Sequence, residues 1–186
     1  IGEERFRREH DCEFLIYDET LIKPIKLAEL EGIEPKQRHG HVRWYDTVKK
    51  GKAYLVGLDP SLGTGGDYAA IQVYQMPEMT QVAEWQHNAT PIQGQVRILK
   101  QILEQIADTV GVQNEIYYSI ENNTLGEAGL VAIADIGEEN IPGVLLSETV
   151  RKGHVRRFRK GYNTTHNSKM AACAKFKQML ESGSLS

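Results

Sequence analysis

The 186-residue sequence has little cysteine and no long apolar run. Its two cysteines, Cys12 and Cys173, lie far apart and belong to no Cys/His cluster, which argues against a zinc site or a disulfide framework. Without a stretch of about 18 apolar residues or a signal-peptide pattern, we expect neither a membrane span nor a membrane partner. The Walker A pattern (Gly-x-x-x-x-Gly-Lys-Ser/Thr) is also missing, so this stretch of chain contains no P-loop for ATP.

Charge is distributed unevenly, although the net formal charge is only −3. Residues 1–150 carry 13 basic and 24 acidic residues, a balance of −11. Residues 151–186 carry nine basic residues and a single acid, Glu181, a balance of +8. This reversal favours a polyanionic partner for the C-terminal part, although a solvated basic face would produce the same pattern.

Hydrophobic patterning predicts an α/β domain. Apolar runs predict strands over 53–60, 67–76 and 80–89, joined by short turns into an antiparallel meander. The segment 92–110 has helical spacing and is followed by Gly111, a typical helix stop. The remaining expected elements are a strand near 12–17, a short helix in 23–33, a polar loop over 34–52, a strand over 115–122, a helix over 124–140, a strand over 143–149 and a helix over 168–183. Antiparallel strands followed by βα units imply a mixed sheet with helices on both faces.

Acidic side chains stand at the ends of two of these strands. Asp59 ends the first strand of the meander, and Glu121 ends the strand that follows the long helix. Sites in α/β sheets gather at strand ends, and these two strands would be neighbours. Their carboxylates, with Asp67 just across a glycine-rich turn, would suit Mg²⁺ or Mn²⁺. The competing interpretation of Asp59 is a carboxylate that caps the turn.

Four segments together resemble a known family, the nuclease domain of the large terminase subunit, the DNA-packaging motor protein of tailed bacteriophages. These segments are FRREHDCEF (6–14), GLDPSLGTGGDYAAI (57–71), YSIENNTLGEAG (118–129) and KGYNTTHNSKMAACAKFKQML (160–180). The resemblance implies an RNase H-like fold of the integrase superfamily and an endonuclease that cuts concatemeric double-stranded DNA. It also implies two Mg²⁺ or Mn²⁺ ions, with Asp59 as the bridging ligand, Glu121 as the second acidic ligand and Asp67 as a further carboxylate near the metals.

The same resemblance sets the expected organisation. Residues 1–50 would join an upstream ATPase domain to a nuclease domain over 51–186, truncated at its C-terminus. The family's third metal ligand, usually in a His-Asp-Asp stretch, has no counterpart, because the only His-Asp pair, His10–Asp11, lies in the wrong segment. We therefore expect this stretch of chain to cut DNA slowly or not at all. The portal ring and the small terminase subunit would be partners, and the location would be the cytoplasm of the infected bacterial host.

The basic C-terminal segment is the expected DNA-binding surface. Arginine grips phosphates, and such binding is salt-dependent and largely independent of sequence. Hydroxyls and backbone N–H groups at the start of a helix can also meet phosphate. The expected DNA-binding residues are Arg151, Lys152, Arg156, Arg157, Arg159, Lys160, Thr164, Thr165 and Lys169. The alternatives are a helix cap with a solvated loop, or docking of the arginines on the acidic part of the chain.

Other functions remain open from sequence alone. A resolvase would share the fold and the metal chemistry. An actin- or sugar-kinase-type ATPase also begins with a strand, an aspartate and a glycine-rich turn, but this chain is short for one. A non-catalytic module that docks on DNA or on the portal ring is the alternative that is not an enzyme.

Overall fold

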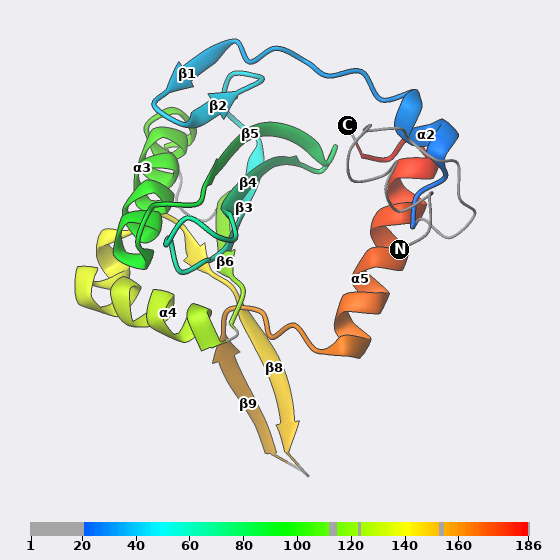
Figure 1. Ribbon diagram of the computed structural model, residues 1–186. Coiled ribbons are helices and arrows are strands. Elements are labelled where there is room, and N and C mark those ends of the chain that lie inside the picture. The colour runs from blue at the N-terminus through cyan, green and yellow to red at the C-terminus, as the bar shows by residue number, and fades with distance from the viewer. Residues whose placement is uncertain (1–20, 112–114, 123, 153–154, 186) are drawn as a thin grey trace.

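The computed structural model describes residues 21–111, 115–122, 124–152 and 155–185. The expected strand near 12–17 lies outside these residues. Most of the described chain forms a seven-stranded mixed sheet in the order β1-β2-β5-β4-β3-β6-β7, with a separate two-stranded ribbon, β8–β9 (Figure 1). The strands are β1 (Gln37–His39), β2 (Val42–Trp44), β3 (Ala53–Asp59), β4 (Ala69–Met76), β5 (Thr80–His87), β6 (Ile116–Ile120), β7 (Val144–Leu145), β8 (Ser147–Lys152) and β9 (Val155–Lys160). The helices are α2 (Pro24–Ala28), α3 (Ile92–Val110), α4 (Thr124–Ile136), the 3₁₀ turn η2 (Glu138–Asn140) and α5 (His166–Glu181).

The predicted meander and the parallel unit after it are confirmed. β3, β4 and β5 pair antiparallel in sequence order, and β6 returns to lie parallel beside β3. The long helix α3 covers the predicted residues and ends at Gly111, whose left-handed backbone (φ 73°) places its N–H on the carbonyl of Ala107. Mixed pairing with helices packed on the sheet is the expected fold class.

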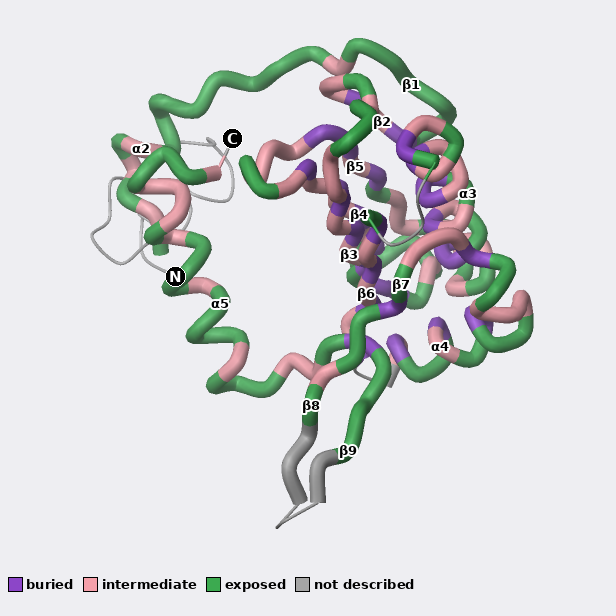
Figure 2. Tube along the Cα trace, turned by 180° about the vertical axis from the view of Figure 1, so that it is seen from behind, coloured by how far each residue is buried: buried purple, intermediate pink, exposed green. Residues whose placement is uncertain are grey.

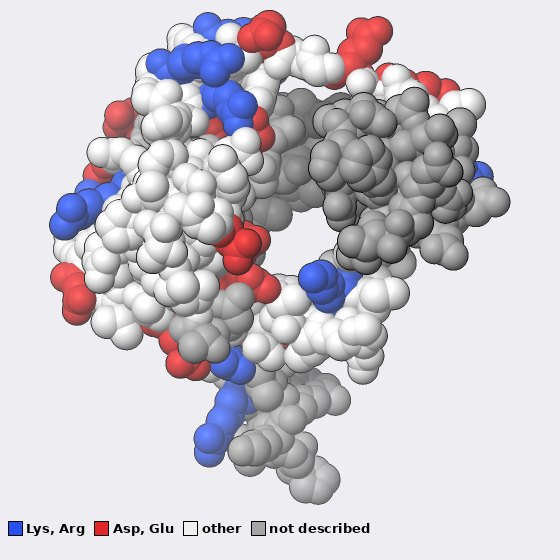
Figure 3. Space-filling view, viewed as in Figure 1, with Lys and Arg blue, Asp and Glu red and all other residues white. Residues whose placement is uncertain are grey.

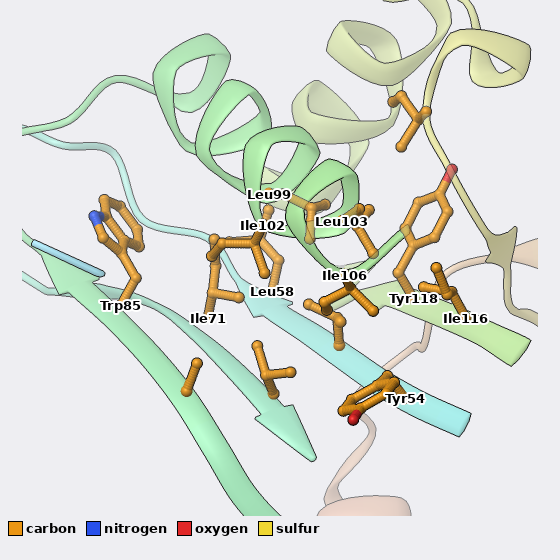
Figure 4. Packing of buried hydrophobic residues seen from close by; sticks show 14 of the residues in the cluster. Tyr54, Leu58, Ile71, Trp85, Leu99, Ile102, Leu103, Ile106, Ile116 and Tyr118 are labelled. Atoms are coloured by element: carbon orange, nitrogen blue, oxygen red, sulfur yellow. The ribbon is translucent and has the colours of Figure 1, made fainter. Parts of the chain in front are cut away.

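The core lies between the sheet and helices α3 and α4. Figure 4 shows Leu99, Ile102 and Leu103 of α3 directed onto Leu58 and Ile71 of the sheet, all of them buried. β4 alternates buried and half-buried residues along its whole length, as a strand does when one face meets a helical layer. Burying one side chain of this size stabilises the fold by about 1.5–3 kcal/mol.

Three local predictions differ from the structure. Residues 37–44, expected in a polar loop, form the β1–β2 hairpin, which pairs with β5 and so moves the start of the sheet N-terminal to the expected domain boundary at residue 50. The strand over 143–149 divides into β7 and β8, because Leu146 donates its N–H to Tyr118 and the chain then leaves the sheet. The helix over 124–140 ends at Ile136, and η2 follows Gly137.

The C-terminal helix contributes little to this core. α5 runs on the opposite side of the sheet from α3 and α4, and its described residues are all exposed or half-buried (Figure 2). Met170 and Phe176 of α5 are among the exposed large hydrophobic side chains. None of the helices in the described part of the chain is long and apolar enough to cross a membrane.

Candidate metal centre and nucleic-acid interface

Two carboxylates meet where β3 and β6 end. The parallel register pairs Leu58 with Ile120, and the N–H of Glu121 donates to the carbonyl of Leu58 at 3.0 Å. Asp59 and Glu121 are therefore the next residues along two adjacent strands, and their side chains share a hydrogen bond. The predicted adjacency of the two strands is confirmed, and it brings together the two acidic residues that sequence analysis selected.

The environment of this pair disfavours a second negative charge. The pKa of Asp59 rises from 3.8 to about 6, mainly through desolvation and then through the hydrogen bond and the charge of Glu121. Although the side chain of Asp59 is exposed in terms of surface area, the surrounding strand ends still remove part of its hydration. The positive charge of Lys169 acts in the opposite direction. Two neighbouring carboxyl groups form a site whose chemistry suits a divalent cation, because the cation offsets the repulsion between their negative charges.

The glycine-rich turn after β3 surrounds a pocket of about 440 Å³ next to this pair. Asp59 and Asp67 both line it, with Tyr68 and Leu125. Asp67 thus lines the same pocket as Asp59. Among the described residues, however, no three His, Cys, Asp or Glu side chains come close enough together to hold a metal ion. The structure therefore supplies a two-carboxylate site, and a metal-binding role for Asp67 stays a prediction.

A buried glutamine fixes the start of that turn. Gln95 on α3 is fully buried; its side-chain amide donates to the carbonyls of Ser61 and Thr90, both at 2.7 Å, and its oxygen accepts the N–H of Ser61 at 3.2 Å. Gly63 is required in the same turn, because its φ is 69° and a Cβ there would overlap the carbonyl of Thr90. Sequence analysis missed Gln95; the available signal was a polar residue next to Val96 on the apolar face of α3.

The strand that carries Glu121 is held from two sides. Gly126 at the start of α4 packs against the carbonyl of Glu121 so closely that a Cβ would overlap it. On the other side, Tyr162 donates its N–H to Ile120 at 2.9 Å, and the N–H of Asn122 donates to Tyr162 at 2.7 Å. The side chain of Asn122 also donates to the carbonyl of Lys160 at 2.8 Å. The base of the β8–β9 ribbon is thereby attached beside the acidic pair.

The basic segment forms this antiparallel ribbon together with the start of α5. Arg157, Arg159 and Lys160 lie in β9 and are exposed. Arg159 lies 3.8 Å from Glu127, and Lys160 pairs with Glu138, so two of the cations are partly neutralised by α4 and η2. The side chains of Arg151, Lys152 and Arg156 lie outside those that the structure describes.

The threonines before α5 have different surroundings. Thr165 is the N-cap of α5 in a capping box with Ser168, so its hydroxyl already serves the helix, as the alternative interpretation expects. Thr164 is half-buried next to it. Lys169, one turn into the helix, is exposed and acts electrostatically on Asp59. The structure therefore brings the expected DNA-binding segment next to the carboxylate pair.

No family model and no curated protein matches this chain. Solved structures do match. The large terminase nuclease from thermophilic phage G20c with bound magnesium is 15% identical, with a TM-score of 0.59 over 82% of this chain and 67% of that one. The same nuclease was also solved with cobalt and with zinc.

Two further structures belong to the same group. The Thermus phage P74-26 large terminase nuclease domain has a TM-score of 0.54 at 14% identity, over 82% of this chain and 65% of that one. The human cytomegalovirus terminase nuclease domain has a TM-score of 0.54 at 13% identity, over 88% of this chain and 73% of that one. The chain spans about two thirds of the length of the phage nucleases. It has the RNase H-like fold of terminase large-subunit nuclease domains.

Proposed function

We propose that this chain is the metal-dependent endonuclease domain of a viral DNA-packaging terminase, which cuts concatemeric double-stranded DNA. The observation that carries the proposal is the Asp59–Glu121 pair, held at the ends of adjacent parallel strands in a fold shared with terminase nucleases. The partners would be double-stranded DNA and, in the complete motor, the portal ring and the small terminase subunit. The location would be the cytoplasm of the infected bacterial host.

Asp59 and Glu121 would hold the metal. The raised pKa of Asp59 beside Glu121 marks a place where a cation would relieve carboxylate repulsion, and oxygen ligands select Mg²⁺ or Mn²⁺. When bound, a pair of such ions would activate water and stabilise the charge that develops on the phosphodiester. Asp67, on the far side of the pocket, would bind the metals directly or orient their hydration water.

The remaining residues would position DNA. Arg157, Arg159 and Lys160 on the ribbon would contact backbone phosphates, as would Arg151, Lys152 and Arg156. Lys169 faces the acidic pair closely enough to alter the pKa of Asp59, so it would contact the phosphate nearest the metals. Thr164 and the backbone at the start of α5 would add neutral donors, while the hydroxyl of Thr165 stays committed to the helix cap.

Metal binding can be tested without relying on cleavage. Mn²⁺ is paramagnetic, so adding it to residues 1–186 should first broaden the amide NMR signals of Asp59 and Glu121 and those of their neighbours. Asp59→Asn should abolish this broadening at low Mn²⁺. The control is Asp108→Asn, the same chemical change at an exposed position near the C-terminal end of α3. Broadening that persists unchanged in Asp59→Asn would rule out the metal site.

Plasmid nicking tests the catalytic role. With only two acidic ligands drawn together in the described residues, nicking with Mg²⁺ or Mn²⁺ should be slow, and Asp59→Asn should remove what remains. Fast nicking would mean that another carboxylate in the chain, with Asp67 the first to test by Asp67→Asn, completes the site. Metal and DNA binding without any nicking would favour a docking module.

A further inference from the structure

A second pocket, of about 410 Å³, lies at the same ends of the strands as the acidic pair. It is formed by the β1–β2 turn, the end of β5 and the residue before β4, and its lining includes Arg38, His41, Arg43, Tyr68, His87 and Asn88. The lining residues are basic, aromatic, neutral polar or glycine. The lining of the first pocket, in contrast, includes two aspartates. The proposed metal site does not involve the residues of the second pocket.

The pocket has a defined internal arrangement. The rings of His41 and His87 stack with their centres 4.5 Å apart and their planes at 28°. His87 is oriented by a 2.6 Å hydrogen bond between its Nδ1 and the hydroxyl of Thr90. Nε2 is therefore the ring nitrogen of His87 that can meet a ligand. Because β2 and β5 pair antiparallel at this point, the two histidines are placed by the sheet itself.

The two arginines of the pocket differ in how firmly each is paired with a carboxylate. Arg43 binds Glu84 through Nε at 3.0 Å, and Tyr45 donates to the same carboxylate, so Arg43 is oriented and partly neutralised. Arg38 lies 3.5 Å from Glu34, whose side chain is almost fully exposed, and such a surface pair is weak and easily exchanged. Arg38 therefore retains a positive charge that can bind an anion.

The position of the pocket indicates which anion. Tyr68 is exposed and lines both pockets, so they adjoin. From Asp59 on β3, the strand order leads through β4 to β5 and β2. At about 4.8 Å per strand the second pocket lies roughly 10–15 Å from Asp59. Projected on the axis of a duplex, that distance corresponds to about three to four base-pair steps of 3.4 Å.

Charge on this face follows the same order. Figure 3 shows a cluster of basic side chains over β1 and β2 with acidic ones beside it, acidic side chains in the middle of the face, and basic side chains again along the ribbon. A DNA duplex that presents one phosphate to the acidic pair would meet the ribbon on one side. On the other side its backbone would pass over the second pocket.

We propose that the pocket between the β1–β2 turn and the end of β5 binds a backbone phosphate of the same DNA, three to four base-pair steps along the duplex axis from the one at the acidic pair. Arg38 supplies the charge, Nε2 of His87 and the side chain of Asn88 supply donors, and Tyr68 packs against the sugar. This site deepens the proposed nuclease function and rests on it. The duplex is thereby held on both sides of the acidic pair.

The test compares charge reversals at two ends of the sheet. Fluorescence anisotropy with a labelled duplex, in EDTA and over a range of KCl, would compare Arg38→Glu with Lys50→Glu. Lys50 is exposed in the turn before β3, at the other end of the strand that Asp59 ends. Arg38→Glu should weaken binding at least several-fold and lower the slope of log affinity against log salt by about 0.9 for the lost contact. Lys50→Glu should leave the slope unchanged.

A ribbon variant separates this inference from the proposed function. If Arg157→Ala/Arg159→Ala weakens binding but Arg38→Glu behaves like Lys50→Glu, the second site is refuted and the nuclease proposal stands. If the wild-type protein does not bind the duplex, both are refuted. His87→Gln keeps a donor and should retain most of the affinity, whereas His87→Ala should lose it. Equal melting temperatures for the Arg38 and Lys50 variants exclude a folding effect. If the loss of DNA affinity in Arg38→Glu disappears at temperatures where both variants are equally folded, the proposal is overturned.

Discussion

The carboxylate pair and the basic ribbon differ in how they are supported. Asp59 and Glu121 stand at the ends of strands that are buried between neighbouring strands and helices. Parallel pairing joins these two strands, and Gln95 holds the backbone of Ser61, two residues after Asp59. The ribbon and α5 project from the sheet with few buried residues (Figure 2). The proposed metal chemistry, which needs ångström precision, thus lies on the buried framework, while the proposed DNA contacts lie on exposed elements.

The contrast should be largest in core substitutions. Leu103→Ala removes a fully buried side chain between α3 and the sheet and should lower the free energy of unfolding by about 2–5 kcal/mol. Phe176→Ala removes a larger side chain from α5 but should change it by only about 0.5 kcal/mol, because Phe176 is 41% exposed. Urea unfolding of both variants measures the difference. Comparable losses would mean that α5 belongs to the cooperative core.

A smaller loss of stability is expected from Gln95, which joins α3 to the turn after β3. Gln95→Leu keeps the volume but leaves the N–H of Ser61 and two carbonyls without their partner, a cost of about 1–3 kcal/mol. The turn after β3 should then exchange its amide hydrogens faster, and Mn²⁺ should bind more weakly. Gln101→Leu, at an exposed position on the same helix, is the control. Unchanged exchange in the turn would show that Gln95 does not hold it.

The smallest effect concerns protonation of the pair without metal. A carboxyl whose pKa is raised on folding, here from 3.8 to about 6, contributes stability that is present below about pH 4 and is lost as the pH rises through 6. Asp59→Asn, which cannot ionise, should therefore gain melting temperature relative to wild type between pH 4 and 7. Because solvent screens charges at this exposed position, the corresponding gain in the free energy of unfolding should stay below about 1 kcal/mol. A difference that does not change with pH in EDTA would contradict the raised pKa of Asp59.

Sequence patterns predicted the buried part well, because burial leaves a periodic signature. The runs in β3, β4 and α3 show it, and the acidic residues at strand ends followed from it. The β1–β2 hairpin was missed because its first strand is polar and wholly exposed. The ribbon was missed for a similar reason, since Phe158 and its neighbours in β9 face solvent and show no alternation of buried and exposed positions.

The second pocket was beyond reach of sequence reasoning for a different reason. Arg38, Tyr68 and His87 come from distant segments, and only strand order brings them together. None of them stands out locally: Arg38 lies in a short exposed strand, Tyr68 just before a strand and His87 at the end of one. Gln95 gave a weak signal on an apolar helix face, but its partners Ser61 and Thr90 could be known only from the fold.

The parallel pairing of β3 with β6 also has a consequence for the order of folding. Two strands and the whole of α3 lie between the halves of the acidic pair, so their pairing closes a long loop and carries a high entropic cost. The local β3–β4–β5 meander can form first, during synthesis, and already contains Asp59. The carboxylate pair exists only after β6 has emerged and inserted beside β3. A growing chain that has produced the meander alone therefore carries no paired carboxylates.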